Sequence, residues 1–335
     1  MKLRKFNLVE DIYYSIGYTS LYLKKEESLF VFNYKKGNDE FFNISIKRPI
    51  NKISNEDIRD GYFDLENAYG YGGYYATTEN SEFLDSALEV YQKKCNDENI
   101  IAEFIRFHPY NSIVHINQSY FDLFALDRET VSIDLRLTKQ ERWSNYSATT
   151  RNLLRRLSND ISIVESFDID TFLALYRSTM DRNNADKSFY FDRTYFENLL
   201  ALQNVKLFAV VYNNIIVNMS FILFGRDLAH YHLSANNNEF LKLSGNYYLL
   251  DAVCDYISNY YPSISEFHLG GGRTNNNSDA LLAFKSKFSK VRNEFCIAGK
   301  VFNQSVYHSY IDDFHRRYPE CIDTKYFLKY RMFSL

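Results

Sequence analysis

The sequence predicts an α/β protein with mixed sheets, divided into two domains. Three observations support this prediction. The chain has 335 residues, of which 46% are hydrophobic, and this is enough for more than one core. Strand and helix patterns alternate along the chain, and the second half follows the order β-α-α-β-β-β-α-β-α. The first half contains a helix and a strand that fit a divergent copy of that pattern.

The first half begins with short strands joined by charged turns. Residues 28–34 and 41–46 are rich in aromatic and β-branched side chains and flank a short polar segment, which is typical of a hairpin. Residues 81–95 place apolar side chains at helical spacing, so an amphipathic helix is expected there. Residues 100–110 then read as a buried strand.

Residues 69–75, YGYGGYY, lie between these elements. Their glycines argue against a helix, so the tyrosines are expected on an irregular loop. Tyr71, Gly72 and Gly73 are candidates for binding a base or a sugar, because tyrosines on loops stack and donate hydrogen bonds. The alternative is a tyrosine-rich turn that only packs.

Arg106 and His108 are polar residues in the predicted strand 100–110 and need partners there. A β-α-β order would bring them close to the glycine-rich loop, where they would hold a diphosphate. The alternative is a structural ion pair between Arg106 and Glu103, which is about equally common for such residues.

The domain boundary is expected close to a helical segment, residues 139–157, that ends in three arginines. These arginines form either a solvated face or a phosphate contact. We expect an N-terminal domain of residues 1–150 and a C-terminal domain of residues 151–335. In the second domain, residues 207–212 and 215–224 flank an Asn-Asn pair and predict a hairpin.

Residues 229–257 combine a strand, a loop and a helix without a break. In the strand, Tyr231 and Leu233 are expected on one face, and His230, His232 and Ser234 on the other. The start of the following helix collects unpaired N–H groups and a positive dipole end, which suits a phosphate group. The candidate phosphate-binding residues are Lys242, Ser244, Gly245 and Asn246.

Residues 266–273 predict a second strand that runs into three consecutive glycines. Such a run indicates a close approach of the backbone, which we interpret as an approach to a ligand. The expected substrate-binding residues here are Gly271, Arg273 and, from the next helical segment, Lys285. Tyr190 in the polar loop 181–192 is a further candidate.

The segments HLSANNNEFLKLSGNYYLLDAV, FHLGGG and LLAFKSKFS resemble the C-terminal acyltransferase half of the Fem-like branch of the GNAT superfamily. SATTRNLLRRLS, TMDRNNADKSFYFDRTYFENL and YGYGG are similar to further parts of that family. The resemblance implies two tandem GNAT-like domains. It is greatest to enzymes that move an acyl group from acyl-CoA to the amino group of a nucleotide-linked amino-deoxy sugar. It points to a dTDP-linked 3-amino-3,6-dideoxyhexose for a surface polysaccharide such as the O-antigen of lipopolysaccharide.

The resemblance also implies that an acyl thioester lies against the strand 229–234. His232 is then the candidate general base, Tyr231 replaces it if a bulge shifts the strand, and Ser234 faces the same site. Proximity alone supplies about 7–11 kcal/mol in such reactions, so no single base is indispensable. The alternative for His232 is a satisfied residue of the sheet. The loop departs from the usual GNAT phosphate loop, since it keeps one glycine, Gly245, and one basic residue, Lys242.

Composition limits the other possibilities. The net charge of −3, without blocks of like charge, argues against binding of nucleic acid or an anionic membrane. No apolar run suits a membrane span and the first residues do not resemble a signal peptide, so a cytoplasmic protein is expected. The four cysteines are widely spaced, and no metal site is expected.

These expectations leave acyl-CoA as a co-substrate and a nucleotide sugar as the second partner, with no tightly bound cofactor. Two alternatives stay open. One is a tRNA-dependent aminoacyltransferase of peptidoglycan, which the Fem-like resemblance also implies. The other is a non-catalytic carbohydrate-binding protein, since tyrosine-rich loops suit sugars. The oligomeric state is left open.

Overall fold

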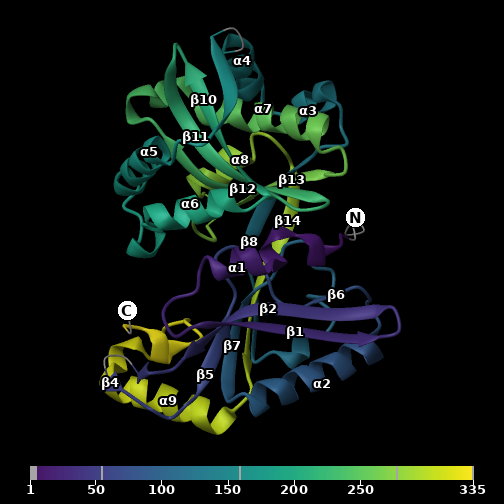
Figure 1. Ribbon diagram of the computed structural model, residues 1–335, viewed down its shortest axis with the longest axis vertical. Helices are drawn as coiled ribbons and strands as arrows, with labels where there is room; N and C mark the ends of the chain where they lie inside the picture. Colours follow the sequence, from purple (N-terminus) through teal and green to yellow (C-terminus); the bar gives the residue numbers. More distant parts are fainter. Residues whose placement is uncertain (1–5, 54–55, 158–159, 277, 334–335) are drawn as a thin grey trace. The chain divides into compact units, whose positions relative to one another are not determined.

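The computed structural model describes residues 6–53, 56–157, 160–276 and 278–333. The chain forms two compact units. The first contains residues 1–9, 13–127 and 294–335, and the second contains residues 10–12 and 128–293. Figure 1 shows helices and strands alternating in both, so the predicted α/β class with two domains is confirmed.

The units do not divide at residue 150, where we expected the boundary. Residues 128–150 belong to the second unit and residues 294–335 return to the first. The return has a simple cause, because strand β14 (Val291–Val301) pairs with β7 (Ile100–Arg106) from Ile297 and Arg106 to Val301 and Ala102. A strand needs hydrogen-bonding neighbours. The backbone pairing of β14 with β7 therefore places the C-terminal segment in the first unit.

The first unit is built around a mixed sheet with the strand order β1-β2-β5-β7-β14. The predicted hairpin is present, with β1 and β2 paired in antiparallel fashion across a turn at Gly37, where φ is +64°. The helices and strands that belong wholly to this unit are α1 (Ile16–Ser20), β1 (Ser28–Lys36), β2 (Asp39–Pro49), β3 (Lys52–Ile53), β4 (Glu56–Asp57), β5 (Phe63–Glu66), β6 (Tyr75–Ala76), α2 (Ser81–Asp97), β7 and α9 (Gln304–Arg317).

The second unit follows the predicted order β-α-α-β-β-β-α-β-α from β9 to α8. Its sheet has the strand order β8-β13-β12-β11-β10-β9. The elements are β8 (Leu123–Asp134, from Arg128 on), α3 (Lys139–Asn145), α4 (Ala148–Leu157), β9 (Ile161–Ser166), α5 (Ile169–Arg182), α6 (Arg193–Ala201), β10 (Val205–Tyr212), β11 (Ile215–Phe224), β12 (Leu228–Asn236), α7 (Gly245–Tyr260), β13 (Glu266–Gly271) and α8 (Ala280–Lys285).

The sheet of the second unit is covered by helices on both faces (Figure 1). Successive side chains of a strand point to opposite faces, and β11 shows the division clearly. Phe221 packs against Phe172 of α5 and Phe196 of α6. Its neighbour Ile222 belongs to the core that includes Leu250 of α7. The predicted hairpin β10–β11 turns at Asn213 and Asn214, whose φ angles of +49° and +63° suit a tight turn.

Each unit contains a parallel strand pair joined through a helix. In the first unit β5 and β7 are parallel with α2 between them in sequence, and in the second β12 and β13 are parallel with α7 between them. This shared β-α-β arrangement is the structural counterpart of the expected internal copy. In the described part of the chain, no helix is long and apolar enough to cross a membrane.

Candidate functional site

The main candidate site lies in the second unit, where β12 and β13 separate. Among the described residues, their parallel pairing runs from Leu228 and Glu266 to His230 and His268 and goes no further. Both strands continue, β12 to Asn236 and β13 to Gly271. Two strands that diverge inside a sheet expose backbone groups that a ligand can pair with.

A bulge in β12 changes the predicted assignment of its two faces. β12 pairs with β11 at Ser220–Ser234 and again at Ile222–Tyr231, so three steps along β12 match two along β11. The extra residue places Tyr231 and Ser234 on the same face. Ser234 was expected on the face of His230 and His232, and this expectation was wrong because of the bulge. A bulge is also the case in which we expected Tyr231 to act as the general base in place of His232.

A small polar group surrounds Ser234 on this face. The hydroxyl groups of Ser220 and Ser234 lie 2.7 Å apart, and the amide nitrogen of Asn218 donates to Ser234 over 3.2 Å. Burial raises the pKa of Tyr231, and hydrogen bonds with Ser234 and Ser220 oppose the shift. These hydroxyl and amide groups can bind a polar part of a ligand at the bulge.

His232 lies on the opposite face, close to α6. Its Nε2 is 3.5 Å from the hydroxyl oxygen of Tyr195, which the sequence had not singled out. Burial, and then the proximity of His230, lowers the pKa of His232 to about 3. The imidazole is therefore neutral at pH 7 and is a much weaker proton acceptor than an ordinary histidine.

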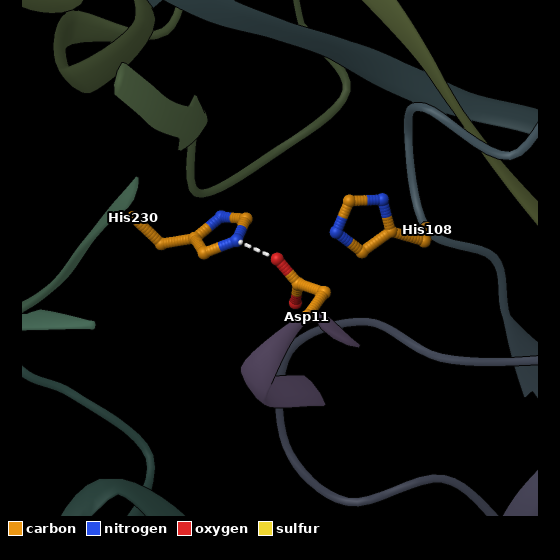
Figure 2. A group of neighbouring side chains, drawn as sticks. All are labelled: Asp11, His108 and His230. Carbon is orange, nitrogen blue, oxygen red and sulfur yellow. Dashed lines mark hydrogen bonds and ion pairs between the residues drawn. The ribbon is translucent and has the colours of Figure 1, made fainter. Parts of the chain in front are cut away.

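His230 is held in the core of the second unit by residues far apart in the sequence. Its Nε2 lies 2.8 Å from Oδ2 of Asp11, and both side chains are buried (Figure 2). Its Nδ1 lies 3.4 Å from Nδ1 of His268 on the neighbouring strand. The His230–His268 contact lies at the last paired position of β12 and β13, where the two strands begin to diverge. No pattern around Asp11 in the sequence indicated such a role.

The start of α7 follows β12 after the short 3₁₀ helix Asn238–Leu243. Ser244 adopts the left-handed conformation, with φ of +58°, and turns the chain into the helix. Gly245 packs so tightly that an added Cβ would lie 3.0 Å from Cγ2 of Val217. Lys242 is exposed and Asn246 is half-buried. All four predicted phosphate-binding residues are thus gathered at one helix start, although their contact with a phosphate stays a prediction.

The glycine run at the end of β13 approaches its own chain closely. An added Cβ at Gly271 would lie 2.9 Å from the carbonyl oxygen of Glu129, and one at Gly272 would lie 2.6 Å from Cγ of Asp279. Gly270 has a φ of +77°. The packing of the second unit by itself therefore accounts for the glycines, which we had interpreted as an approach to a ligand.

Asp279 organises this loop and the helix after it. Its carboxylate accepts hydrogen bonds from the backbone N–H groups of Arg273, Thr274, Leu281 and Leu282. Burial raises the pKa of Asp279, but these hydrogen bonds outweigh the effect and hold it below its usual range. An aspartate just before an apolar helical run is an N-cap signal, so the sequence could have revealed this residue.

Lys285 is a buried lysine beside the same loop. Its Nζ donates a 2.6 Å hydrogen bond to the carbonyl oxygen of Gly271, and Arg128 donates over 3.0 Å to that of Gly272. Burial lowers the pKa of Lys285 to about 7, with Asp279 opposing the shift and Arg128 adding to it. The lysine therefore exchanges a proton near neutral pH, which is a property of acid and base groups at functional sites.

Arg273 and Tyr190 both lie at the C-terminal end of α5. The guanidinium of Arg273 donates to Asn183 over 3.2 Å, and the hydroxyl of Tyr190 donates to Asp181 over 2.8 Å. Each of these two predicted substrate-binding residues thus contacts the C-terminal end of α5.

The glycine-rich loop of the first unit is mostly buried. The ring of Tyr71 is half-buried and makes edge contacts with Tyr13, His108 and Phe295, at centroid distances of 5.3, 5.8 and 5.2 Å. Gly72 and Gly73 are buried, and an added Cβ at Gly73 would lie 2.7 Å from Phe107. The packed-turn alternative therefore describes most of this loop.

Arg106 has partners other than those we expected. It donates to Glu66 over 2.7 Å and to the carbonyl oxygen of Asn67 over 2.6 Å. The alternative pairing with Glu103 is wrong, because Glu103 lies elsewhere in the core and accepts hydrogen bonds from Tyr74 and Tyr91. His108 lies beyond the end of β7 and is buried, with Nδ1 3.3 Å from the backbone nitrogen of Tyr110.

Comparison with known proteins places the site in a known type of domain. Residues 144–286 match the family described as Acetyltransferase (GNAT) domain. The crystal structure of FemX is similar over 92% of this chain and 95% of its own, with a TM-score of 0.69 and 14% identity. The C-terminal domain of a putative lysylphosphatidylglycerol synthetase from Agrobacterium fabrum is similar over 87% and 88%, with a TM-score of 0.51 and 13% identity. No curated protein matches the sequence.

At these identities the solved structures establish the fold, and the family match adds the type of domain. The match includes β12, the start of α7, the glycine run and Lys285. The resemblance to GNAT proteins is therefore confirmed for the second unit, and a Fem-like fold is confirmed for the chain. Residues 144–286 match an acetyltransferase domain of the GNAT type, and this match supports acyltransferase activity for the chain.

Proposed function

We propose that this acyltransferase moves an acyl group from acyl-CoA to the amino group of a nucleotide-linked amino-deoxy sugar. The observation that carries the proposal is the divergence of β12 and β13 after His230 and His268, beside the start of α7 in the GNAT domain. An acyl thioester fits between diverging strands, and the phosphates of CoA suit a helix start. Acyl-CoA and nucleotide sugars are cytoplasmic metabolites, so the proposed reaction takes place there.

The reaction needs few chemical groups from the protein. The sugar amine attacks the thioester carbonyl, a C–N bond forms, the C–S bond breaks, and the proton lost by the amine ends on the CoA thiol. Backbone N–H groups at the bulged part of β12 would stabilise the oxyanion. Tyr231 and Ser234 lie at this bulge, and Lys285, with a pKa of about 7, is the group suited to hold a proton.

Arg273 and Tyr190 each contact the end of α5 and are proposed to bind the nucleotide sugar. In the first unit, Tyr71 stays the candidate for stacking on the base, and Gly72 and Gly73 stay candidates next to it in the sequence. Arg106 and His108 are less suited to a diphosphate, because Arg106 already donates to Glu66 and His108 is buried in the core.

Calorimetry with an acyl-CoA tests the donor. Asn246→Asp adds a carboxylate to the first turn of α7 without a change of size, and should weaken binding about tenfold or more through repulsion of phosphate. Asn259→Asp makes the same change in the last turn of the same helix, where the side chain is exposed, and should leave binding unchanged. This pair is preferable to Gly245→Asp, which would also crowd Val217. Equal binding by both variants, or none by the parent protein, would exclude this donor site.

A second candidate is aminoacyl transfer from tRNA to a peptidoglycan precursor. The fold similarity to FemX over most of both chains favours it, while the net charge of −3 argues against a tRNA partner. Product analysis distinguishes the two. The parent protein is supplied with acetyl-CoA and dTDP-linked amino sugars, or with aminoacyl-tRNA and a nucleotide-linked muropeptide, and the acylated product is identified by mass. Sugar binding without any product would favour the carbohydrate-binding alternative.

A further inference from the structure

A set of potential metal ligands lies in the first unit and includes none of the residues assigned above. It consists of His115, Glu294 and Cys296, and one ligand atom from each lies within 4.8 Å of the other two. His115 Nε2 is 3.0 Å from a carboxylate oxygen of Glu294. No sequence motif indicates this set, because His115 is about 180 positions from the other two residues.

The backbone holds these three side chains in place. Glu294 and Cys296 are two residues apart on β14, so they project from the same face of the strand. His115 lies in a turn after β7, and the preceding Val114 is buried in the same core cluster as Cys296. The ligand atoms are therefore brought together by a strand and an anchored turn, and a metal would not have to order them.

The chemistry of the three groups selects the metal. We propose that His115, Glu294 and Cys296 bind a divalent zinc-class ion, with a water molecule in the fourth position. Thiolate, imidazole and carboxylate are the usual zinc ligands, and three protein ligands with one open position form a known type of site. The thiolate and the carboxylate together neutralise the charge of a divalent cation.

The surroundings of His115 also suit a metal ligand. Its second ring nitrogen, Nδ1, lies 2.9 Å from the side-chain amide of Gln118. When the metal binds Nε2, the proton moves to Nδ1, and the amide turns its oxygen towards it by a 180° flip. Cys296 would bind the ion as the thiolate, so binding releases the thiol proton to the solvent.

Titration of the reduced, untagged, metal-free protein with Co²⁺ tests the proposal. We expect one ion per chain, a sulfur-to-cobalt charge-transfer band, and loss of the band when one equivalent of Zn²⁺ displaces the cobalt. Cys296→Ser should abolish the band. Cys321→Ser, which alters another buried cysteine of the same unit, should leave it intact. Gln118→Ala should weaken affinity about 10- to 100-fold, and His115→Ala by at least as much.

Two results would overturn the proposal. One is the absence of a charge-transfer band in the parent protein. The other is a band of full intensity in Cys296→Ser, which would mean that a different thiol binds the ion. If Cys296→Ser fails to fold, His115→Ala decides, because that side chain is exposed and its loss leaves the core intact. In that variant, an unchanged affinity excludes the site.

Discussion

Nε2 of His230 lies 2.8 Å from Oδ2 of Asp11, although the two residues are 219 positions apart. The contact ties β12 to a three-residue segment, residues 10–12, that joins the second unit from the far N-terminal end of the chain. Gly225 packs against the same aspartate, since an added Cβ there would lie 2.8 Å from Oδ2 of Asp11.

Removal of this carboxylate should reduce stability. Asp11→Ala takes away a buried partner of His230 and should lower the free energy of unfolding by about 1–3 kcal/mol. Glu10→Ala removes the neighbouring carboxylate, which pairs with Arg226 at the surface, and should cost at most about 1 kcal/mol. Urea unfolding of both variants measures the difference. Equal losses of unfolding free energy would show that the buried Asp11–His230 pair contributes no more to stability than the surface pair Glu10–Arg226.

The buried side chain of Lys285 should lower the free energy of unfolding at neutral pH while it supports turnover. The folded protein loses the proton of Lys285 at about pH 7, whereas the unfolded chain keeps it until about pH 10.5. The unfolded state therefore binds more protons between these values, and the free energy of unfolding rises with pH across that window. Lys285→Met should remove this rise and stabilise the protein at pH 7 by roughly 1–3 kcal/mol, with the lost hydrogen bond to Gly271 included.

Thermal unfolding at several pH values, together with turnover, checks this prediction. Turnover should fall at least tenfold in Lys285→Met, since the variant cannot exchange a proton. Lys287→Met is the control, because Lys287 is only partly buried and contacts the hydroxyl group of Tyr247 over 2.8 Å. A variant at 285 that loses both stability and activity would indicate a purely structural lysine.

His232 should affect turnover without setting its pH dependence. Its pKa of about 3 lies far below the neutral range, so no limb of the pH–rate profile between pH 6 and 8 should belong to it. We expect His232→Asn to lower kcat and to leave the position of that limb unchanged. A limb that disappears in His232→Asn but persists in Lys285→Met would assign the titrating group to His232 and not to Lys285.

Tyr71 should contribute to substrate binding and to packing. Tyr71→Ala should raise KM for the nucleotide sugar with kcat nearly unchanged, because stacking of about 1–3 kcal/mol is lost equally in ground and transition states. The same change removes three ring contacts and should lower the melting temperature. Tyr71→Phe keeps the ring and should keep both properties. A hundredfold fall in kcat at unchanged KM would place this loop at the reacting centre.

Local patterns in the sequence were sufficient for the order of the elements in the second unit. Alternation of apolar residues, the Asn213–Asn214 turn and the helical spacing in α7 depend on neighbours within a few positions, and the structure confirms them. The same local information gathered Lys242, Ser244, Gly245 and Asn246 at one helix start. These features are fixed by backbone sterics and by burial of one face of each element.

Only the tertiary structure decided which distant residues meet. The bulge that turns Ser234 to the side of Tyr231 depends on the pairing of β12 with β11, and no single strand reveals such a shift. The close packing of Gly271 on Glu129, the pair Asp11–His230 and the set at Cys296 each join segments that sequence spacing does not relate. The pKa values of His232 and Lys285 follow from burial. Burial of a side chain depends on the whole fold, and composition does not determine it.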